Sequence, residues 1–550
     1  MFNVPRYQRE YTWAKRDWEN LFDDISDNDK GYFLGSIIVI DHGYNAEKGV
    51  TQCELIDGQQ RLTTIMLLLR AFYDKFANMK DKQSVKVRES IAGCVWKTDE
   101  FDEPDMDALK IDSEVASDAD KGEFLDILRH GSVAAGARSA YARNYAFFAR
   151  KMAEMASEWP IYIALLAARI LNNVILLPIE AESQDTALRI FSTLNDRGLP
   201  LADADIFKSQ FYKHFSAEGR KDEFVARWKR LEETANLIFR PASGTPLDEL
   251  FTRYMYYRRA HKGIRDTTTK SLRDFYSEGG YEILKQDETL DDLEALLDFW
   301  RRVDAQEGFS ERVLRRLFVL SYAPNGMWAY LLSTWFLARR DEGGNLDDGE
   351  LYGFLRYITG FIYAYSLERP GVNALRGPVY PALIDIVNGR DADFSAHLFD
   401  RETITGRFRS YQFTNQRRFT RSMLVWWAYT DPGQPLMDLD TTLEIEHIYA
   451  RKRNEVHPLA DRSNLEALGN KAMLEKRVNI RAADYQLADK RKYYEGYVND
   501  KGAEVPGTAV RELVEIARRG DFAEADIEER TEKIIAAFVD WLGELGLLRE

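Results

Sequence analysis

Residues 216 to 400 carry helical periodicity almost throughout. In segments such as LDDLEALLDFWRRVD and NGMWAYLLSTWFLARR, apolar residues recur every three or four positions, as a helix with one buried face requires. This region holds no cofactor motif, and we interpret its scattered tryptophan and tyrosine side chains as core. The flanking regions mix strand-like and helical patterns. The sequence therefore predicts an α+β chain that is mostly helical.

The chain has 550 residues, whereas a single hydrophobic core stops growing at roughly 250–300 residues. We predict three regions: a mixed α/β region over 1–215, a helical region over 216–400, and a third region over 401–550 that ends in a helical tail. Within the first region the patterns predict strands at 32–40, 53–57 and 172–181, the last of them buried, and helices at 62–79 and 183–198.

Composition narrows the class of protein. Hydrophobic residues make up 45% and aromatic residues 13% of the chain, which excludes a disordered polymer, and no apolar run reaches the ~18 residues of a membrane span. The start, MFNVPRYQREYTW, has no apolar signal region. Cys53 and Cys94 are too few for a disulfide framework or a four-thiol zinc site. We expect a soluble cytoplasmic protein with no membrane partner.

Charge is unevenly distributed along the chain. The formal net charge is −15, yet nucleic-acid binding depends on local basic patches and not on the total. Residues 98–126 are dense in acids and are predicted to be a solvated excursion. In contrast, residues 401–426 hold six arginines and one acid, and residues 471–492 hold seven basic and three acidic residues.

Between these basic stretches lies LEIEHIYARKRNEVHPLADRSNLEALGNKAMLEKRVNIR, residues 443–481, which contains two of the seven histidines, His447 and His457. From the residues alone, a polar surface loop is the commoner interpretation. The alternative is metal-dependent cleavage of nucleic acid, in which a histidine takes a proton from water while a divalent ion stabilises charge on the phosphate. Glu446 beside His447, with asparagines downstream, has the side chains for that chemistry.

A second group of polar residues lies near the N-terminus, in NVPRYQREYTW and ELIDGQQRLTT. Asp57 and Gly58 are expected to turn the chain after a strand, and Gln59, Gln60 and Arg61 to begin a helix. A helix N-terminus with a nearby arginine can hold a phosphate, although such an arginine is often a structural ion pair. Neither a P-loop nor a G-x-G-x-x-G motif is present.

These motifs resemble a known family. VPRYQREYTW, YFLGSIIV, ELIDGQQRLTT and IFSTLNDRGLPLADADIFK occur in the order seen in the ParB/sulfiredoxin-like half of GmrSD-type modification-dependent (type IV) restriction endonucleases, and residues 443–481 resemble their HNH half. The resemblance implies an N-terminal ParB/sulfiredoxin-like mixed α/β domain, a helical coupling domain, and a C-terminal ββα-metal (HNH) domain with flanking helices.

For the first half, the resemblance implies a sensor domain that binds and hydrolyses a nucleoside triphosphate. Arg9, Arg61 and Arg197 would neutralise phosphate charge. Family members usually carry a further element before the first motif, which here begins at residue 3, so we expect either a preceding segment or a fold that lacks a helix. The implied nucleotide-binding residues are Tyr7, Gln8, Arg9, Asp57, Gly58, Gln59, Gln60, Arg61, Asn195 and Arg197, within motifs that also include Pro5, Tyr11, Trp13, Leu194 and Gly198.

For the second half, the resemblance implies His447 as general base, Glu446 and Asn479 as ligands of Mg²⁺ or Mn²⁺, and Asn470 as the residue that orients His447. His457 is an alternative base and Asn464 an alternative orienting residue. Ala450 stands where the family often has proline. The residues expected to contact DNA phosphate are Lys490, Arg417, Arg418 and Arg421.

The function implied is a nucleotide-binding and nucleotide-hydrolysing, metal-dependent endonuclease of anti-phage defence that cuts double-stranded, modified foreign DNA. Two alternatives stay open: a catalytically inactive ParB-like DNA-binding adaptor, and an HNH nuclease that does not depend on nucleotide. The sequence names neither the modification nor the preferred nucleotide, and it leaves homo-oligomer formation open.

Overall fold

The computed structural model describes residues 1–550 except 6–7, 9–10, 28–30, 46–49, 100, 102, 114, 116–119, 135, 159, 184–185, 188–189, 191–201, 372, 484–485 and 550. Its contacts divide the chain into two compact units, Met1–Arg230 and Leu231–Glu550. Each unit is described by itself below.

The first unit is built on a five-stranded sheet of order β6-β1-β3-β2-β7. β2 and β3 pair antiparallel, whereas β1 is parallel to both β3 and β6, and β7 is parallel to β2. A separate antiparallel hairpin joins β4 and β5. The strands are β1 (Phe2–Val4), β2 (Tyr32–Asn45), β3 (Val50–Asp57), β4 (Trp96–Thr98), β5 (Pro104–Leu109), β6 (Ile111–Ser113) and β7 (Val174–Glu180).

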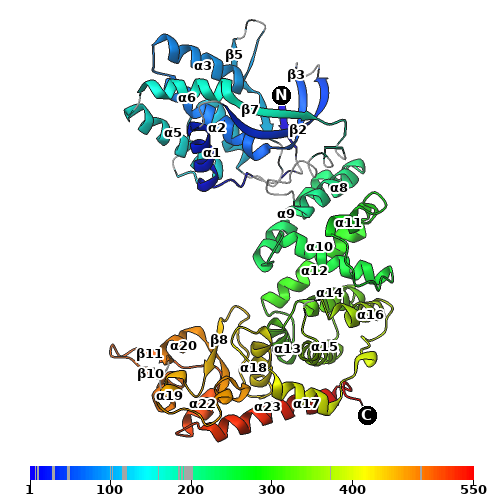
Figure 1. Ribbon diagram of the computed structural model, residues 1–550. Helices are drawn as coiled ribbons and strands as arrows, with labels where there is room; N and C mark the ends of the chain where they lie inside the picture. The colour runs from blue at the N-terminus through cyan, green and yellow to red at the C-terminus, as the bar shows by residue number, and fades with distance from the viewer. Residues whose placement is uncertain are drawn as a thin grey trace. The chain divides into compact units, whose positions relative to one another are not determined.

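The helices within residues 15–173 gather against one side of the sheet (Figure 1). Ile37, Val39 and Leu55 of β2 and β3 join the large core that these helices build, while Ile38 and Ile56, on the opposite face, belong to a second, smaller cluster. Both faces of the central strands are therefore covered, which explains the unbroken apolar run there. The helices are α1 (Lys15–Asp27), α2 (Gln59–Phe76), α3 (Lys82–Val95), α4 (Lys121–His130), α5 (Ala140–Glu158), α6 (Pro160–Asn173), α8 (Asp203–Ala217) and α9 (Lys221–Ile238), the last of which contains the division between units.

Two expectations for this unit need correction. The strand predicted at 172–181 is present as β7, but it pairs only with β2 at the sheet edge, so Ile175 and Leu177 are exposed and not buried. The acid-rich stretch 98–126 is not simply an excursion, because it supplies β5, β6 and part of α4, and β6 completes the sheet beside β1. Most of the helix predicted at 183–198 lies outside the described residues.

The second unit begins with helices and short 3₁₀ turns. Its aromatic side chains pack in the interior, as in the stacked pair Phe299 and Phe336. The elements before the hairpin are α10 (Pro246–His261), α11 (Leu272–Ser277), η1 (Glu282–Lys285), α12 (Asp287–Asp304), α13 (Glu311–Ser321), α14 (Met327–Arg339), α15 (Asp348–Glu368), α16 (Arg376–Val387), η2 (Ser395–His397), α17 (Arg401–Ser410) and α18 (Arg418–Ala428).

An antiparallel two-stranded hairpin, β8 with β9, follows, and the last helix, α23, packs against the 3₁₀ turns that precede β9 and against α17 (Figure 1). Phe538 of α23 contacts the rings of Phe408 and Trp426, so the last helix shares a core with α17 and α18. The elements here are β8 (Leu443–His447), α19 (Arg451–Val456), η3 (Arg462–Glu466), η4 (Leu468–Asn470), β9 (Lys471–Glu475), α20 (Lys476–Ala482), α21 (Leu487–Glu495), β10 (Gly496–Val498), β11 (Glu504–Pro506), α22 (Arg511–Arg518) and α23 (Glu524–Glu544).

The prediction of a mixed α+β, mostly helical chain with an N-terminal α/β sheet is confirmed. Among the described residues, no helix combines the length and the apolar character needed to cross a bilayer.

Candidate active site

His447 is the last residue of β8, directly opposite Lys471 at the start of β9. α20 follows β9 without a gap, so the segment has a strand–strand–helix order. Consecutive strand residues project to opposite faces. The side chains of Glu446 and His447 therefore project to opposite faces of β8, where they have different neighbours.

On the first face, the imidazole of His447 is buried and its Nε2 makes no hydrogen bond, although Glu466 Oε1 lies 3.4 Å away. Burial and the neighbouring Lys471 charge lower the pKa of His447 to about 4, and the Glu466 carboxylate opposes this shift. A neutral imidazole with an unoccupied buried nitrogen can accept a proton.

Lys471 connects His447 to the basic segment. Its ammonium is fully buried and bonds to Glu466 Oε2 at 2.5 Å, to Asn415 Oδ1 at 3.0 Å and to the Phe413 carbonyl. Arg451 Nη2 reaches the other oxygen of Glu466 at 2.9 Å. The loop that carries Phe413 and Asn415 is therefore anchored at the His447 cluster.

On the opposite face, Glu446 is buried and its Oε1 accepts two hydrogen bonds, from Lys490 Nζ at 2.5 Å and from Tyr494 Oη at 2.7 Å. Lys490 also donates to the His447 carbonyl at 2.8 Å. Asn479 of α20 donates through Nδ2 to Glu444 Oε2 at 2.9 Å. The structure thus brings Glu446 and Asn479 to the same face of β8, each with a different partner.

This face carries side chains whose oxygens could bind a metal ion. Glu444 and Glu446 lie two residues apart on β8, so they share a face, and the amide of Asn479 meets Glu444 there. Carboxylate and amide oxygens suit Mg²⁺ or Mn²⁺. A divalent ion bound at Glu446 would have to compete with the ammonium of Lys490.

Asn470, fully buried, closes the turn that follows His447. Its Oδ1 accepts the Tyr449 backbone N–H at 2.7 Å, and its Nδ2 donates to the carbonyls of Tyr449 at 3.2 Å and Leu465 at 2.9 Å. Its own carbonyl accepts from the Ile448 N–H at 2.9 Å. Asn470 therefore bonds to the backbone just after His447, and its predicted orienting role stays a prediction.

His457, the alternative general base, and Asn464, the alternative orienting residue, have their contacts away from the His447 side chain. His457 is exposed just beyond α19, where its backbone carbonyl accepts from Tyr449 Oη at 2.7 Å. Asn464 donates to Glu524 at 3.0 Å and to Glu528 at 2.9 Å, both on α23. These contacts tie Asn464 to the last helix and not to His447.

Lys490 is only 1% exposed, so in this arrangement its ammonium is not presented to a surface ligand. The arginines predicted to contact DNA are exposed. Arg417 and Arg418, with Arg407, line a cavity of about 660 Å³ that also includes Tyr411. The Arg417 guanidinium lies over the Tyr411 ring, 4.8 Å from its centre.

In the first unit, the DGQQR motif forms the corner between β3 and α2. Gly58 adopts φ +88°, and an added Cβ there would lie 2.5 Å from Ile37 Cγ2. The turn therefore requires glycine. Arg61 Nη1 donates to the Ser36 carbonyl at 2.8 Å, while its Nη2 lies 3.7 Å from Asp57 Oδ2.

The first motif is tied to the same corner. Gln8 Nε2 donates to the Ile56 carbonyl at 3.0 Å, and Gln60 Oε1 accepts the backbone N–H groups of Thr12 at 2.8 Å and Trp13 at 3.3 Å. The structure thus brings Gln8 together with residues 57–61. Tyr7, Arg9, Asn195 and Arg197, which were predicted to join them, lie outside the described residues.

Residues 1–212 match the family model "GmrSD restriction endonuclease, N-terminal domain". The matched residues include the whole sheet of the first unit and the β3–α2 corner, so this region is similar to that domain. No curated protein matches the chain. The GmrSD-type match does not extend to the β8–β9 hairpin.

Three residues of the candidate site were missed by sequence reasoning. Glu444 could have been found, because it alternates with Glu446 along a strand. Glu466 and Tyr494 carry no such signal, since only the tertiary structure brings them to His447 and Glu446.

Proposed function

We propose that this chain is a GmrSD-type restriction endonuclease that hydrolyses phosphodiester bonds of foreign DNA at an HNH-like ββα site, under control of a nucleoside triphosphate bound in the first unit. The GmrSD-type region supports a defence nuclease. The observation that carries the location of the cutting site is His447, buried with an unoccupied Nε2 at the end of a strand whose other face gathers oxygen donors.

In the proposed reaction, His447 receives a proton from water as the water oxygen attacks phosphorus, and the bond from phosphorus to the leaving sugar oxygen breaks. A divalent ion held by Glu446 and Asn479, with Glu444 beside them, would neutralise charge on the phosphate. Asn470 keeps the backbone after His447 in place through its bonds to Tyr449.

DNA would approach along the basic segment. Arg417, Arg418 and Arg421 are exposed on or beside the first turn of α18, and the loop preceding them is anchored by Lys471 to the His447 cluster. Exposed arginines can neutralise successive phosphates, which supports binding without specifying sequence.

The nucleotide would bind at the β3–α2 corner, where a helix N-terminus and Arg61 offer positive potential to phosphate. Hydrolysis would affect cutting only if it favours one of two arrangements of the protein. Because the corner contains several motif residues within one network, Arg61→Ala is expected to abolish turnover of ATP, GTP, CTP or UTP. A nuclease that cuts equally well without any of these nucleotides would be nucleotide-independent.

The decisive experiment measures plasmid nicking and linearisation with Mg²⁺ or Mn²⁺, with and without each nucleotide. Wild type is compared with His447→Ala and with His457→Ala, a matched control in the same segment. We expect loss of cutting in the first variant alone, with DNA binding kept in both. Substrates should include unmodified plasmid, DNA with hydroxymethylated or glucosylated bases, and phosphorothioated DNA.

One observation favours a second candidate, a DNA-binding adaptor that does not cut. Glu446 Oε1 is already engaged by Lys490 and Tyr494, and a carboxylate held in this way can serve as structure alone. DNA binding without cutting of any of these substrates, with either metal, would favour the adaptor.

A further inference from the structure

The segment that carries Asn470 rests on a buried arginine of the last helix. Arg530 of α23 is 7% exposed. Its Nη1 donates to the carbonyls of Gly469 and Lys471, each at 2.8 Å, and lies 3.4 Å from that of Leu468. These carbonyls belong to the residues on either side of Asn470.

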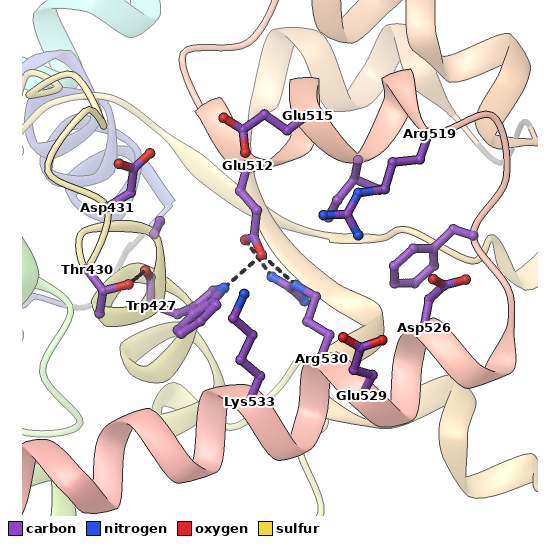
Figure 2. Close-up of a pocket in the computed structure, with 13 residues that line it drawn as sticks. Trp427, Thr430, Asp431, Glu512, Glu515, Arg519, Asp526, Glu529, Arg530 and Lys533 are labelled. Carbon is purple, nitrogen blue, oxygen red and sulfur yellow. Dashed lines mark hydrogen bonds and ion pairs between the residues drawn. The ribbon is translucent and has the colours of Figure 1, made fainter.

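Glu512 of α22 holds the other side of the same guanidinium. Its two carboxylate oxygens accept from Arg530 Nε and Nη2, each at 2.8 Å, and Trp427 Nε1 donates to Oε1 at 2.9 Å. Figure 2 shows Arg530 rising from α23 to meet Glu512, with Trp427 beside them. A planar guanidinium bound along two edges has a fixed orientation.

The backbone at Gly469 is also seated directly on α23. Its N–H donates to Thr531 Oγ1 at 3.0 Å, and a Cβ at this position would lie 2.1 Å from the Ile527 carbonyl oxygen. The turn before β9 therefore has no room to shift toward the helix, and Arg530 prevents it from moving away.

We infer that Arg530, oriented by Glu512, is a positioning residue for the proposed nuclease site. Arg530 holds residues 468–471, Asn470 in that segment holds the N–H groups of Ile448 and Tyr449, and these follow directly after His447. This inference rests on the proposed function for its catalytic meaning. The contacts that connect Arg530 to Ile448 and Tyr449 can be tested whether or not the proposed function holds.

Lysine at position 530 would keep the positive charge beside Glu512. A single ammonium, however, cannot donate hydrogen bonds to the carboxylate and to the peptide carbonyls with the fixed planar geometry of a guanidinium. In Arg530→Lys we expect kcat for cutting to fall about 100-fold, the loss associated with a reacting group displaced by roughly 1 Å. KM for DNA should stay within about 3-fold, because the DNA-facing arginines lie elsewhere. A purely structural role would instead reduce the amount of folded protein.

Arg356→Lys is the matched control. Arg356, on α15, bonds through Nη2 at 3.1 Å to Glu544 of α23, the helix that carries Arg530. Among the described residues it makes no contact to the hairpin, so this variant alters an arginine–glutamate pair between α15 and α23 and should leave kcat unchanged.

Chemical rescue gives a sharper test, because a cavity of about 310 Å³ borders Arg530. The exposed side chains of Glu515, Arg519 and Glu529 also line it (Figure 2). In Arg530→Ala, low millimolar guanidinium can enter this space and should restore part of kcat. The same addition should not affect His447→Ala.

Amide hydrogen exchange provides a readout independent of cutting. Arg530→Lys should accelerate exchange at Ile448 and Tyr449, whereas Arg356→Lys should not. Unchanged exchange at both amides together with unchanged kcat would overturn the inference. If wild type cuts no substrate, the proposed function fails, but faster exchange at these two amides still establishes that Arg530 positions the turn, and unchanged exchange refutes it.

Discussion

The backbone N–H of Tyr449 donates to Asn470 Oδ1 at 2.7 Å, and the carbonyl of Tyr449 accepts from Asn470 Nδ2 at 3.2 Å. One buried amide side chain therefore satisfies both peptide groups of a residue 21 positions earlier. Because Tyr449 lies two residues after His447, this reciprocal pair sets where the strand carrying the imidazole ends.

Replacement of Asn470 should affect stability and cutting together. Asn470→Ala leaves the Tyr449 N–H and two carbonyls without partners, at a cost of about 1–3 kcal/mol for each buried group left unsatisfied. Asn470→Asp keeps an acceptor for the Tyr449 N–H but places a buried carboxylate against two carbonyl oxygens, so its stability and kcat should fall at least as far as those of Asn470→Ala. Thermal unfolding and plasmid nicking measure the two effects, and a stable, fully active Asn470→Ala would contradict the role given to this residue.

Metal binding should stabilise the protein. A divalent ion at 100 times its Kd adds about 2.7 kcal/mol to the free energy of unfolding. Mg²⁺ or Mn²⁺ should therefore raise the melting temperature of wild type, and the rise should shrink in Glu444→Gln and Asn479→Ala. Glu455→Gln, which alters an exposed glutamate of α19, is the control. An equal rise in all four proteins would place the ion elsewhere.

The pair of Glu512 and Arg530 should make stability depend on pH. Burial opposes ionisation of Glu512, but the Arg530 charge and hydrogen bonds from Arg530 and Trp427 outweigh it and lower the pKa of this carboxyl from 4.5. Its stabilising effect is therefore complete above that value and is lost as pH falls through the lower, folded-state pKa. The difference in melting temperature between wild type and Glu512→Gln should shrink as pH falls below 4.5. A difference in melting temperature that does not change with pH would show that the stabilisation does not come from the ionised Glu512–Arg530 pair.

Gly58 should be the least replaceable residue of the β3–α2 corner. Alanine at positive φ costs about 1–2 kcal/mol, and at Gly58 the new Cβ would also overlap Ile37. Gly43 has φ +75° with open space around it, so Gly43→Ala isolates the backbone cost. We expect Gly58→Ala to destabilise the first unit by about 1–3 kcal/mol more than Gly43→Ala, because overpacking adds to strain. Denaturant unfolding monitored by hydrogen exchange in this unit would measure both, and equal effects would mean that Ile37 moves aside freely.

The exposed arginines should contribute to DNA affinity through salt-dependent contacts. Removal of one phosphate contact lowers the slope of log Kobs against log salt by about 1. Arg417→Gln and Arg418→Gln are each expected to do so while kcat at saturating DNA is kept. Arg401→Gln is the control, because that guanidinium already pairs with Asp540 at 2.7 Å. If Arg401→Gln changes this slope as much as the other two variants, DNA affinity depends on the total charge of the protein and not on specific phosphate contacts of Arg417 and Arg418.

Several features could be predicted from short-range patterns. The strand at 32–40 and the helix beginning near Arg61 are both present, as β2 and α2. His447 ends a strand, Asn470 lies at a turn, and Asn479 lies on the following helix. Each of these follows from periodicity or from a turn residue within about ten positions.

Other features depended on distant partners. Lys490 was expected to contact DNA phosphate, yet its ammonium is buried against Glu446, 44 positions away. β7 was expected in the interior because its residues are apolar, yet it forms an edge, since strand order depends on which strands pair.

The sequence by itself therefore determined the helical regions, the turn at Gly58, and the neighbouring carboxylate and imidazole at 446 and 447. Only the tertiary structure decided that Glu446 faces Lys490 and Tyr494, that His447 faces Glu466, and that Arg530 supports Gly469 from 61 positions away. The reason is physical: dihedral preferences and side-chain periodicity act over a few residues, whereas a buried charge persists only where folding brings its partner.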